Sequence, residues 1–467
     1  MNIINKTSEI LPAAFLERIR NQFPDQFESF LQAIDQTPAV SLRTNPAKFK
    51  LSTNAEHIPW CDSGMFLNQR PSFTLDPLFH SGAYYVQEAS SMFVEQAFQQ
   101  TEHTGNRVVL DLCAAPGGKS THLLSLMDKS DLLVANEVIR SRVSVLNENI
   151  QKWGHQNVVV CNNDPSDFSD LEGLFDVILI DAPCSGEGLF RRDPSAIEQW
   201  SVDNTNLCAT RQRRIVSDIW PSLKAGGYLI YSTCTFNPAE NEQNLQWLAE
   251  NNEIESIRIP LHENWGVEEI QHQNMFGYRF LPHKVKGEGF FLTLIRKKEG
   301  TEQFSIPKKN KSRLEKMPKQ FSEIRNWLHT SNTEFFTKSD FIVAFPEDKI
   351  QLLNVLSDRL RVISYGLTIA QFKKNDLLPE HTFALSIDRN PSVFNTIELN
   401  LRDALFFQKK DEIRIDSTVK GWLLVQYQGV PLGFVKNLGN RANNYFPKEW
   451  RIRMALPELP EPWYLIP

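Results

Sequence analysis

The sequence contains little cysteine and little glycine, and it has no apolar run long enough to cross a membrane. Six cysteines are too few to cross-link 467 residues, and none forms a C-x-x-C pair, so zinc knuckles and thioredoxin chemistry are not expected. The 21 glycines exclude a collagen-like chain. The first residues also lack the basic and apolar regions of a secretory signal. We therefore predict a cytoplasmic protein with reduced thiols, no membrane partner and no metal.

An excess of positive charge is missing as well. The net charge is −6, so the chain as a whole is not a basic nucleic-acid coat. Residues 308–319 carry six Lys or Arg against one Glu, which we interpret as a solvated linker in preference to a nucleic-acid contact. Near the C-terminus, basic and aromatic residues are mixed, which suits either a phosphate-and-stacking surface or the edge of a small β-domain. These residues are Lys436, Arg441, Tyr445, Phe446, Lys448, Trp450, Arg451 and Arg453.

The length of the chain suggests about three domains, and 41% hydrophobic residues are enough for large cores. Residues 27–34 place apolar side chains at i, i+3, i+4 and i+7, which predicts a helix. Short, turn-broken segments follow this helix and indicate a small mixed α/β domain. The predicted units are an N-terminal α/β domain, a central domain, a basic linker and a β-rich C-terminal region, at 1–104, 105–298, 299–320 and 321–467.

The central domain alternates short apolar segments with helical ones. Five segments lack the polar and apolar alternation of half-exposed strands, as buried parallel strands do. They cover residues 108–110, 132–134, 158–160, 177–180 and 228–231. A long helix is predicted over 203–224, ended by Gly226 and Gly227, and a strand over 289–296 closes the domain. Right-handed crossovers between such strands form a doubly wound α/β sheet, which binds ligands at the carboxyl ends of its strands.

Each predicted parallel strand ends in polar or reactive residues. In chain order these are the turn 113–119, Glu137, Asp164, Asp181 with Cys184, and Cys234. Because the carboxyl ends of parallel strands meet at one edge of a sheet, we expect these side chains to gather in one site.

The turn after the first strand allows two nucleotide interpretations. Gly118-Lys119-Ser120 resembles the end of a P-loop, as in ATPases. However, Cys113 stands where that motif has its first glycine, and Pro116 removes an N–H that would bind phosphate. A nucleoside cofactor without phosphate fits better, because the paired glycines let the backbone approach it closely.

Three charged residues fit such a nucleoside. Glu137 is placed to accept both ribose hydroxyls, Asp164 to meet the adenine edge, and Lys119 to pair with a carboxylate of the ligand. Each alone could be an ordinary surface or turn residue. Their positions at successive strand ends favour a cofactor site.

Cys184 and Cys234 follow strands that are neighbours in such sheets, so both thiols can face one pocket. A thiolate that adds to carbon 6 of a pyrimidine makes carbon 5 nucleophilic enough to take a methyl group. Asp181 is placed to hold a proton on ring nitrogen 3, and the second thiol can assist product release. The residues alone do not rank the two thiols.

Three motifs carry a resemblance to a known family. They are CAAPGGKS (113–120), DAPCSGEGLFRRDP (181–194) and GGYLIYSTCTFNPAENE (226–242). They resemble the motifs of the Nop/Sun-type RNA 5-methylcytosine methyltransferases, which use S-adenosylmethionine. Together these motifs are long and specific.

The resemblance extends over nearly the whole chain and is weakest between residues 300 and 400. SLRTNP (41–46) and YVQEASSM (85–92) look like the family's N-terminal RNA-binding region, and GEGFFLTLIRK (287–297) continues the core. The segment 421–451 looks like the PUA-like domain of the bacterial RsmF-type ribosomal RNA branch. We place that RNA-binding domain at about 381–467.

The resemblance implies a Rossmann-like class I methyltransferase core with S-adenosylmethionine as cofactor. It implies that Cys234 attacks carbon 6 and that Cys184 aids product release. It also implies a cofactor site formed by Cys113, Ala114, Ala115, Pro116, Gly117, Gly118, Lys119, Glu137, Asp164 and Asp181.

We therefore expect a monomeric enzyme that methylates carbon 5 of a cytosine in RNA, with 16S ribosomal RNA or the small ribosomal subunit as partner. The same chemistry on tRNA and a non-catalytic, RNA-binding ribosome assembly factor stay open as alternatives. A methyltransferase of exocyclic amines is disfavoured, because the turn after the fourth strand is Ala-Pro-Cys and not an aromatic-bearing Pro-Pro turn.

Overall fold

The computed structural model describes residues 7–50, 55–102, 105–306, 314–330, 332–374 and 376–458. Residues 307–313 of the predicted basic linker and residues 459–467 of the predicted C-terminal region lie outside this part of the chain. Within the described ranges, no helix combines the length and the apolar character that a membrane span requires.

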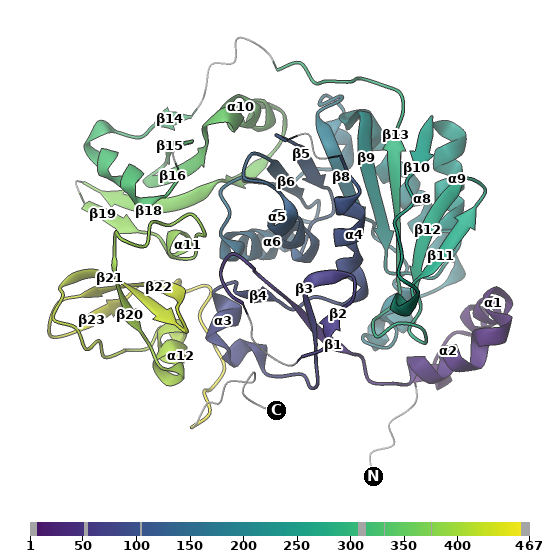
Figure 1. Cartoon of the computed structure of the whole chain (residues 1–467), viewed down its shortest axis with the longest axis horizontal. Coiled ribbons are helices and arrows are strands. Elements are labelled where there is room, and N and C mark those ends of the chain that lie inside the picture. The colour runs from purple at the N-terminus through teal and green to yellow at the C-terminus, as the bar shows by residue number, and fades with distance from the viewer. Residues whose placement is uncertain are drawn as a thin grey trace.

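A ten-stranded sheet forms the centre of the molecule (Figure 1). Its strands follow the order β11-β12-β13-β9-β8-β5-β6-β7-β17, and β10 pairs with β13. The five predicted apolar segments are its parallel strands, which confirms the Rossmann-like core. They are β5 (Val108–Asp111), β6 (Leu132–Asn136), β7 (Val158–Cys161), β8 (Phe175–Asp181) and β9 (Leu223–Thr233).

Helices cover both faces of this sheet, so successive residues of each parallel strand are buried on opposite sides. Val177 and Leu179 join one core, and Ile178 and Ile180 join the other. The first core includes α4 (Val94–Gln99), α5 (Gly118–Leu126) and α6 (Arg140–Trp153). The second core includes α8 (Val202–Ile219), α9 (Glu242–Asn251) and α10 (Ile350–Arg359).

Antiparallel strands extend the sheet at both ends. The predicted strand 289–296 is β13, which pairs with β9, and a hairpin that precedes it in the chain extends the sheet on its other side. At the opposite edge, a strand from the C-terminal region pairs with β7 and covers its exposed hydrogen-bonding groups. The added strands are β10 (Ile254–Ser256), β11 (Glu268–His272), β12 (Met275–Phe280), β13 (Phe290–Lys297) and β17 (Val362–Tyr365).

The predicted helix over 203–224 is too long. The helix α8 ends at Ile219, a short 3-10 turn follows, and β9 begins at Leu223. Pro221 lacks the N–H that would continue the helix ladder, and the backbone becomes extended at Leu223. Gly226 and Gly227 therefore lie inside the strand instead of ending the helix.

The N-terminal region packs directly on the core. Its predicted helix over 27–34 is confirmed as α2. Phenylalanines of the first two helices are buried against Phe190, Trp200 and Phe236 of the central domain. The elements are α1 (Ala13–Gln22), α2 (Phe27–Ile34), α3 (Pro77–His80) and a sheet of β2 (His57–Ile58), β3 (Cys61–Leu67), β1 (Val40–Thr44) and β4 (Tyr84–Tyr85).

The C-terminal region contains two further sheets (Figure 1). The first holds β14 (Glu315–Lys316), β15 (Thr333–Lys338), β16 (Phe341–Pro346), β18 (Leu367–Lys373) and β19 (Asp376–Pro379). The second holds β20 (Asn395–Glu398), β21 (Gly421–Tyr427), β22 (Val430–Asn437) and β23 (Ala442–Asn444). The helices of the C-terminal region that accompany these sheets are α11 (His381–Ala384) and α12 (Leu401–Lys409). One further short helix, α7 (Pro194–Gln199), belongs to the central domain.

One member of the mixed basic and aromatic group at the C-terminus is not a surface residue. Phe446 is 1% exposed and packs against the N-terminal region in a shared core, so it cannot offer a stacking surface. Tyr445 contacts Trp422 at a ring distance of 4.5 Å. Trp450 lies 5.2 Å from the ammonium of Lys152 on α6. For these three aromatic residues, the edge of a small β-domain is the better interpretation.

A buried arginine joins β1 of the N-terminal region to the core. Arg43 has no exposed surface, and its guanidinium donates to Gln87 at 2.9 Å, to Thr121 at 2.8 Å and to the Gly118 carbonyl at 3.2 Å. The same group lies 4.6 Å from the ring centroid of Trp153. Thr121 and Gly118 belong to the first turns of α5, so the N-terminal region holds the segment that follows the turn 113–119.

We expect Arg43→Met to lower the free energy of unfolding by ~3 kcal/mol, because buried acceptors lose a charged donor. Arg414→Met, at an exposed position, is the matched control and should leave stability unchanged. Urea unfolding followed by tryptophan fluorescence measures both. Equal midpoints for the two variants would show that Arg43 does not hold the N-terminal region in place.

Candidate active site

The turn between β5 and α5 is shaped for close approach by a ligand. Gly117 has φ of +112°, a left-handed conformation that a side chain rarely adopts, and it caps the start of α5. A Cβ on Gly118 would lie 3.3 Å from the ring of Tyr85, so glycine there leaves room for β4. The Ala114 N–H donates to the Asn136 carbonyl at 2.8 Å, which joins this turn to the end of β6.

The two predicted nucleoside-binding carboxylates differ in their surroundings. Glu137 is 2% exposed, accepts from the Ile139 N–H at 2.8 Å, and lies 3.4 Å from Arg142. Asp164 is half-buried and pairs with Arg214 of α8 at 3.2 Å. Partial burial acts to raise the pKa of Asp164, but hydrogen bonds from Arg214 and Ser166 hold that pKa below its usual value.

Asp181 and Lys119 pair with each other across the ends of β8 and α5. The Lys119 ammonium lies 2.7 Å from Oδ2 of Asp181, and the Ser232 hydroxyl donates to Oδ1 at 2.8 Å. Burial alone would lower the pKa of Lys119, but the negative charge of Asp181 raises it. Lys119 was predicted to pair with a carboxylate of the ligand, and Asp181 to hold a proton on ring nitrogen 3 of the base. In this structure the two residues pair with each other.

The structure brings the two predicted thiols into contact. The sulfur atoms of Cys184 and Cys234 lie 2.9 Å apart, and the Cys234 N–H donates to the Cys184 sulfur at 3.3 Å. The hydrogen bond with Cys234, together with burial, raises the pKa of Cys184 well above its usual value. Both side chains are free thiols and only partly buried, and they lie at the rim of the sheet.

A buried glutamate fixes the turn that carries Cys184. Glu240 accepts from the Ser185 N–H at 2.9 Å, from the Ser185 hydroxyl at 2.5 Å and from Gln212 at 3.0 Å. The Tyr231 hydroxyl donates to the Glu240 carbonyl at 2.8 Å. Burial raises the pKa of Glu240. Glu240 lies in the motif 226–242, but nothing in its sequence context predicted this role.

A second buried glutamate ties the same turn to the N-terminal region. Glu187 pairs with Arg18 of α1 at 2.6 Å and accepts from Trp200 at 2.9 Å and Asn237 at 3.1 Å. Glu187 lies in the motif 181–194. Its acidic side chain was the only feature of the sequence that could have indicated this role. Its partners lie far away in the chain, so their pairing could not be read from the sequence.

Two backbone segments cross closely beside the thiols. A Cβ on Gly188 would lie 2.3 Å from the Gly289 carbonyl oxygen, so only glycine fits at position 188. The Gly188 N–H donates to the carbonyl of Cys234 at 2.9 Å. The segment before β13 therefore packs on the turn that carries Cys184. Gly188 of that turn in addition contacts Cys234.

The residues fit a bound S-adenosylmethionine. The glycine-lined turn 113–119, the buried carboxylate of Glu137 and the polar ends of β7 and β8 lie along one rim of the sheet. The thiols lie at the same rim, after β8 and β9. This is the arrangement in which a doubly wound sheet holds a nucleoside beside reacting groups.

Comparisons with known families agree with this arrangement. Residues 99–296 match the family described as 16S rRNA methyltransferase RsmB/F. Residues 11–89 match the N-terminal domain of 16S rRNA methyltransferase RsmF, and residues 394–452 match the methyltransferase RsmF PUA domain.

Two solved structures from Pyrococcus horikoshii share the fold. A methyltransferase homolog protein is 27% identical with a TM-score of 0.51, and the match covers 62% of this chain and all of that chain. NSun6, crystallised with SFG, is 20% identical with a TM-score of 0.53, over 62% of this chain and 99% of that chain.

Curated relatives match at full length. The ribosomal RNA small subunit methyltransferase F of Vibrio cholerae serotype O1 (strain M66-2) is 32% identical, over 94% of this chain and 97% of that protein. The protein of the same name from Shewanella piezotolerans is 32% identical, over 93% and 96%. With three matched domains and this identity over nearly both full lengths, the chain belongs to the RsmB/F family of 16S ribosomal RNA methyltransferases, which use S-adenosylmethionine.

Proposed function

We propose that this chain transfers a methyl group to carbon 5 of a cytosine in small-subunit ribosomal RNA through a covalent adduct with Cys234. The contact of 2.9 Å between the sulfurs of Cys184 and Cys234 is the observation that carries this proposal. One thiol is enough for attack on a base, and a second thiol in contact with it serves the release that must follow. A cysteine that only fills the core needs no such partner at a strand end.

In the proposed reaction, the Cys234 thiolate forms a bond to carbon 6 of the cytosine, which makes carbon 5 nucleophilic. S-adenosylmethionine supplies the electrophilic methyl group. The hydrogen on carbon 5 then leaves as a proton to solvent, and the bond from sulfur to carbon 6 breaks, which restores the aromatic ring. Cys234 departs as a thiol when its sulfur takes a proton from Cys184, and solvent then reprotonates Cys184.

Cys184 is suited to help this departure. Its raised pKa keeps its thiol protonated, and its sulfur touches the sulfur of Cys234. A proton passed from Cys184 to the departing sulfur stabilises the leaving group. The choice of Cys234 as the nucleophile follows the family resemblance.

Asp181 is proposed to hold a proton on ring nitrogen 3 while Cys234 attacks. Its carboxylate accepts from Lys119 and Ser232, which fixes it at the end of β8, three residues before Cys184. A cytosine that reaches this group has to be single-stranded or flipped out of its helix. The backbone turn 113–119 and Glu137 are proposed to hold the cofactor beside it.

An RNA substrate is supported by the PUA and N-terminal domain matches, and small-subunit ribosomal RNA is supported by the full-length relatives. The choice of nucleotide depends on positioning by these domains through phosphate and stacking contacts.

RNA containing 5-fluorocytosine should trap this protein, because fluorine at carbon 5 cannot leave as a proton. Cys234→Ala should abolish the adduct, whereas Cys184→Ala should still form it. On unmodified RNA, where a proton can leave carbon 5, Cys184→Ala should keep adducts that release slowly. Cys208→Ala, at a buried cysteine of α8, is the control and should trap like the unmodified protein. Denaturing gels with labelled RNA measure all four. Undiminished trapping by Cys234→Ala would overturn the thiol assignment.

Glu137→Gln should weaken S-adenosylmethionine binding about tenfold or more, because the ribose hydroxyls lose a charged acceptor. Gln retains an acceptor for the Ile139 N–H, so the fold should persist. Isothermal titration with the cofactor measures the affinity, and Glu250→Gln on the exposed side of α9 is the control. An unchanged affinity for Glu137→Gln would place the ribose elsewhere.

Bisulfite sequencing of RNA from cells with and without this chain should show one protected cytosine in 16S ribosomal RNA that disappears with the protein. The same loss in tRNA instead would favour the tRNA alternative. Loss of no 5-methylcytosine, with defective subunit assembly, would favour the non-catalytic assembly factor.

A further inference from the structure

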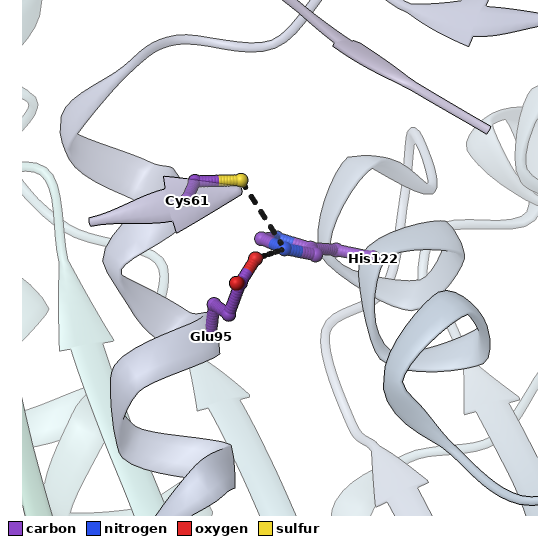
Figure 2. Close-up of side chains that lie close together, drawn as sticks. All are labelled: Cys61, Glu95 and His122. Carbon is purple, nitrogen blue, oxygen red and sulfur yellow. Dashed lines mark hydrogen bonds and ion pairs between the residues drawn. The ribbon is translucent and has the colours of Figure 1, made fainter. Parts of the chain in front are cut away.

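A buried cluster of three side chains lies outside the proposed active site. Cys61 at the start of β3, Glu95 on α4 and His122 on α5 point toward one another (Figure 2). The Nε2 atom of His122 lies 2.9 Å from Oε2 of Glu95 and 3.7 Å from the sulfur of Cys61. The three potential ligand atoms all lie within 4.8 Å of one another. None of them takes part in the proposed methyl transfer.

Thiolate, imidazole and carboxylate are the three ligand types that Zn²⁺ uses in proteins. Tetrahedral zinc with sulfur at about 2.3 Å and nitrogen at about 2.0 Å separates these two ligand atoms by roughly 3.5 Å. The sulfur of Cys61 and Nε2 of His122 are already close to this separation, at 3.7 Å. We propose that Cys61, Glu95 and His122 bind a structural zinc ion that joins the N-terminal region to α5.

The charge of Glu95 is the first support for a cation here. Glu95 is 3% exposed, and among the described residues its ion-pair partner is His122. No Lys or Arg side chain pairs with its carboxylate within the described part of the chain.

The guanidinium of Arg43 does not contact the carboxylate of Glu95 directly. Its guanidinium donates to Gln87, Gly118 and Thr121, and no ion pair joins it to Glu95 within the described part of the chain. The remaining contacts of Glu95 with protein N–H groups are long, at 3.4 Å from the Asp62 N–H and 3.5 Å from Gln99. A buried carboxylate with such weak partners is stabilised by a directly bound cation.

Zinc binding requires two proton movements. The Cys61 thiol, whose pKa is raised by burial and by Glu95, releases its proton to solvent as the sulfur binds the metal. The neutral His122 ring moves its proton from Nε2 to Nδ1. That Nδ1 atom has no hydrogen-bond partner in the described structure, so this movement breaks no contact of Nδ1. The thiolate and the carboxylate then balance the two charges of the ion.

Ser63 is the candidate for the fourth position of a tetrahedral site. The Ser63 hydroxyl lies 3.8 Å from the Cys61 sulfur. The ligands come from three elements that are distant in the sequence, with none of the short spacings that mark zinc motifs. That is why the sequence predicted no metal.

The test measures metal in the full-length protein carrying Cys184→Ser and Cys234→Ser, which removes the active-site thiols as competing ligands. After incubation with zinc and dialysis, elemental analysis should find one zinc ion per chain. Cys61→Ala and His122→Ala should each lose this ion, and Cys208→Ala should retain it. Binding of Co²⁺ should produce a thiolate charge-transfer band that Cys61→Ala lacks.

Circular dichroism checks that the variants are folded. Glu95→Gln keeps the shape of the side chain and a hydrogen-bond acceptor for His122, so this variant should stay folded. It should still bind zinc, but more weakly than the parent protein with Glu95. If the parent protein binds no zinc and gives no cobalt band, or if Cys61→Ala retains both, the proposal is wrong. This outcome does not depend on methyltransferase activity, which is measured separately.

Discussion

The parallel pairing of β8 with β9 controls the distance between the two thiols, and the proposed chemistry depends on that distance. Asp181 lies opposite Ser232 in this register, so Cys184 and Cys234 leave the sheet at nearly the same level. A shift of one residue would turn the following side chains to the other face of the sheet. Glu240 then fixes the turn of Cys184 through Ser185, so the thiol contact results from strand register and a buried hydrogen-bond network.

The N-terminal region makes direct contacts on two sides of this site. Glu88 accepts from the N–H groups of Ser90 and Ser91, both at 2.9 Å, and of Glu288 at 2.8 Å, next to the segment that packs on Gly188. Arg43 holds the start of α5 on the other side. The PUA-type sheet packs against this region in a shared core (Figure 1). The domains proposed to bind RNA are therefore joined to the proposed cofactor turn by packing and hydrogen bonds.

Several features of the fold were predictable because they depend on local patterns. Apolar runs identify the parallel strands, since both faces of these strands are buried. The end of α8 was predicted wrongly, because Gly226 and Gly227 were given more weight than Pro221. The strands beyond β13 and the edge strand β17 were missed, because pairing between distant segments leaves little trace in a short window. The pairing of Lys119 with Asp181 was missed for the same reason, because the two residues come from segments that are distant in the sequence.

The sequence by itself determined the α/β core, the order of reactive residues along it and, through its motifs, the family. These properties are encoded in residue types and spacings within single segments. The tertiary structure decided the contact between Cys184 and Cys234, the networks around Glu187 and Glu240, and the cluster of Cys61, Glu95 and His122. Such contacts join residues that are tens to hundreds of positions apart, and only the packed chain brings them within bonding distance.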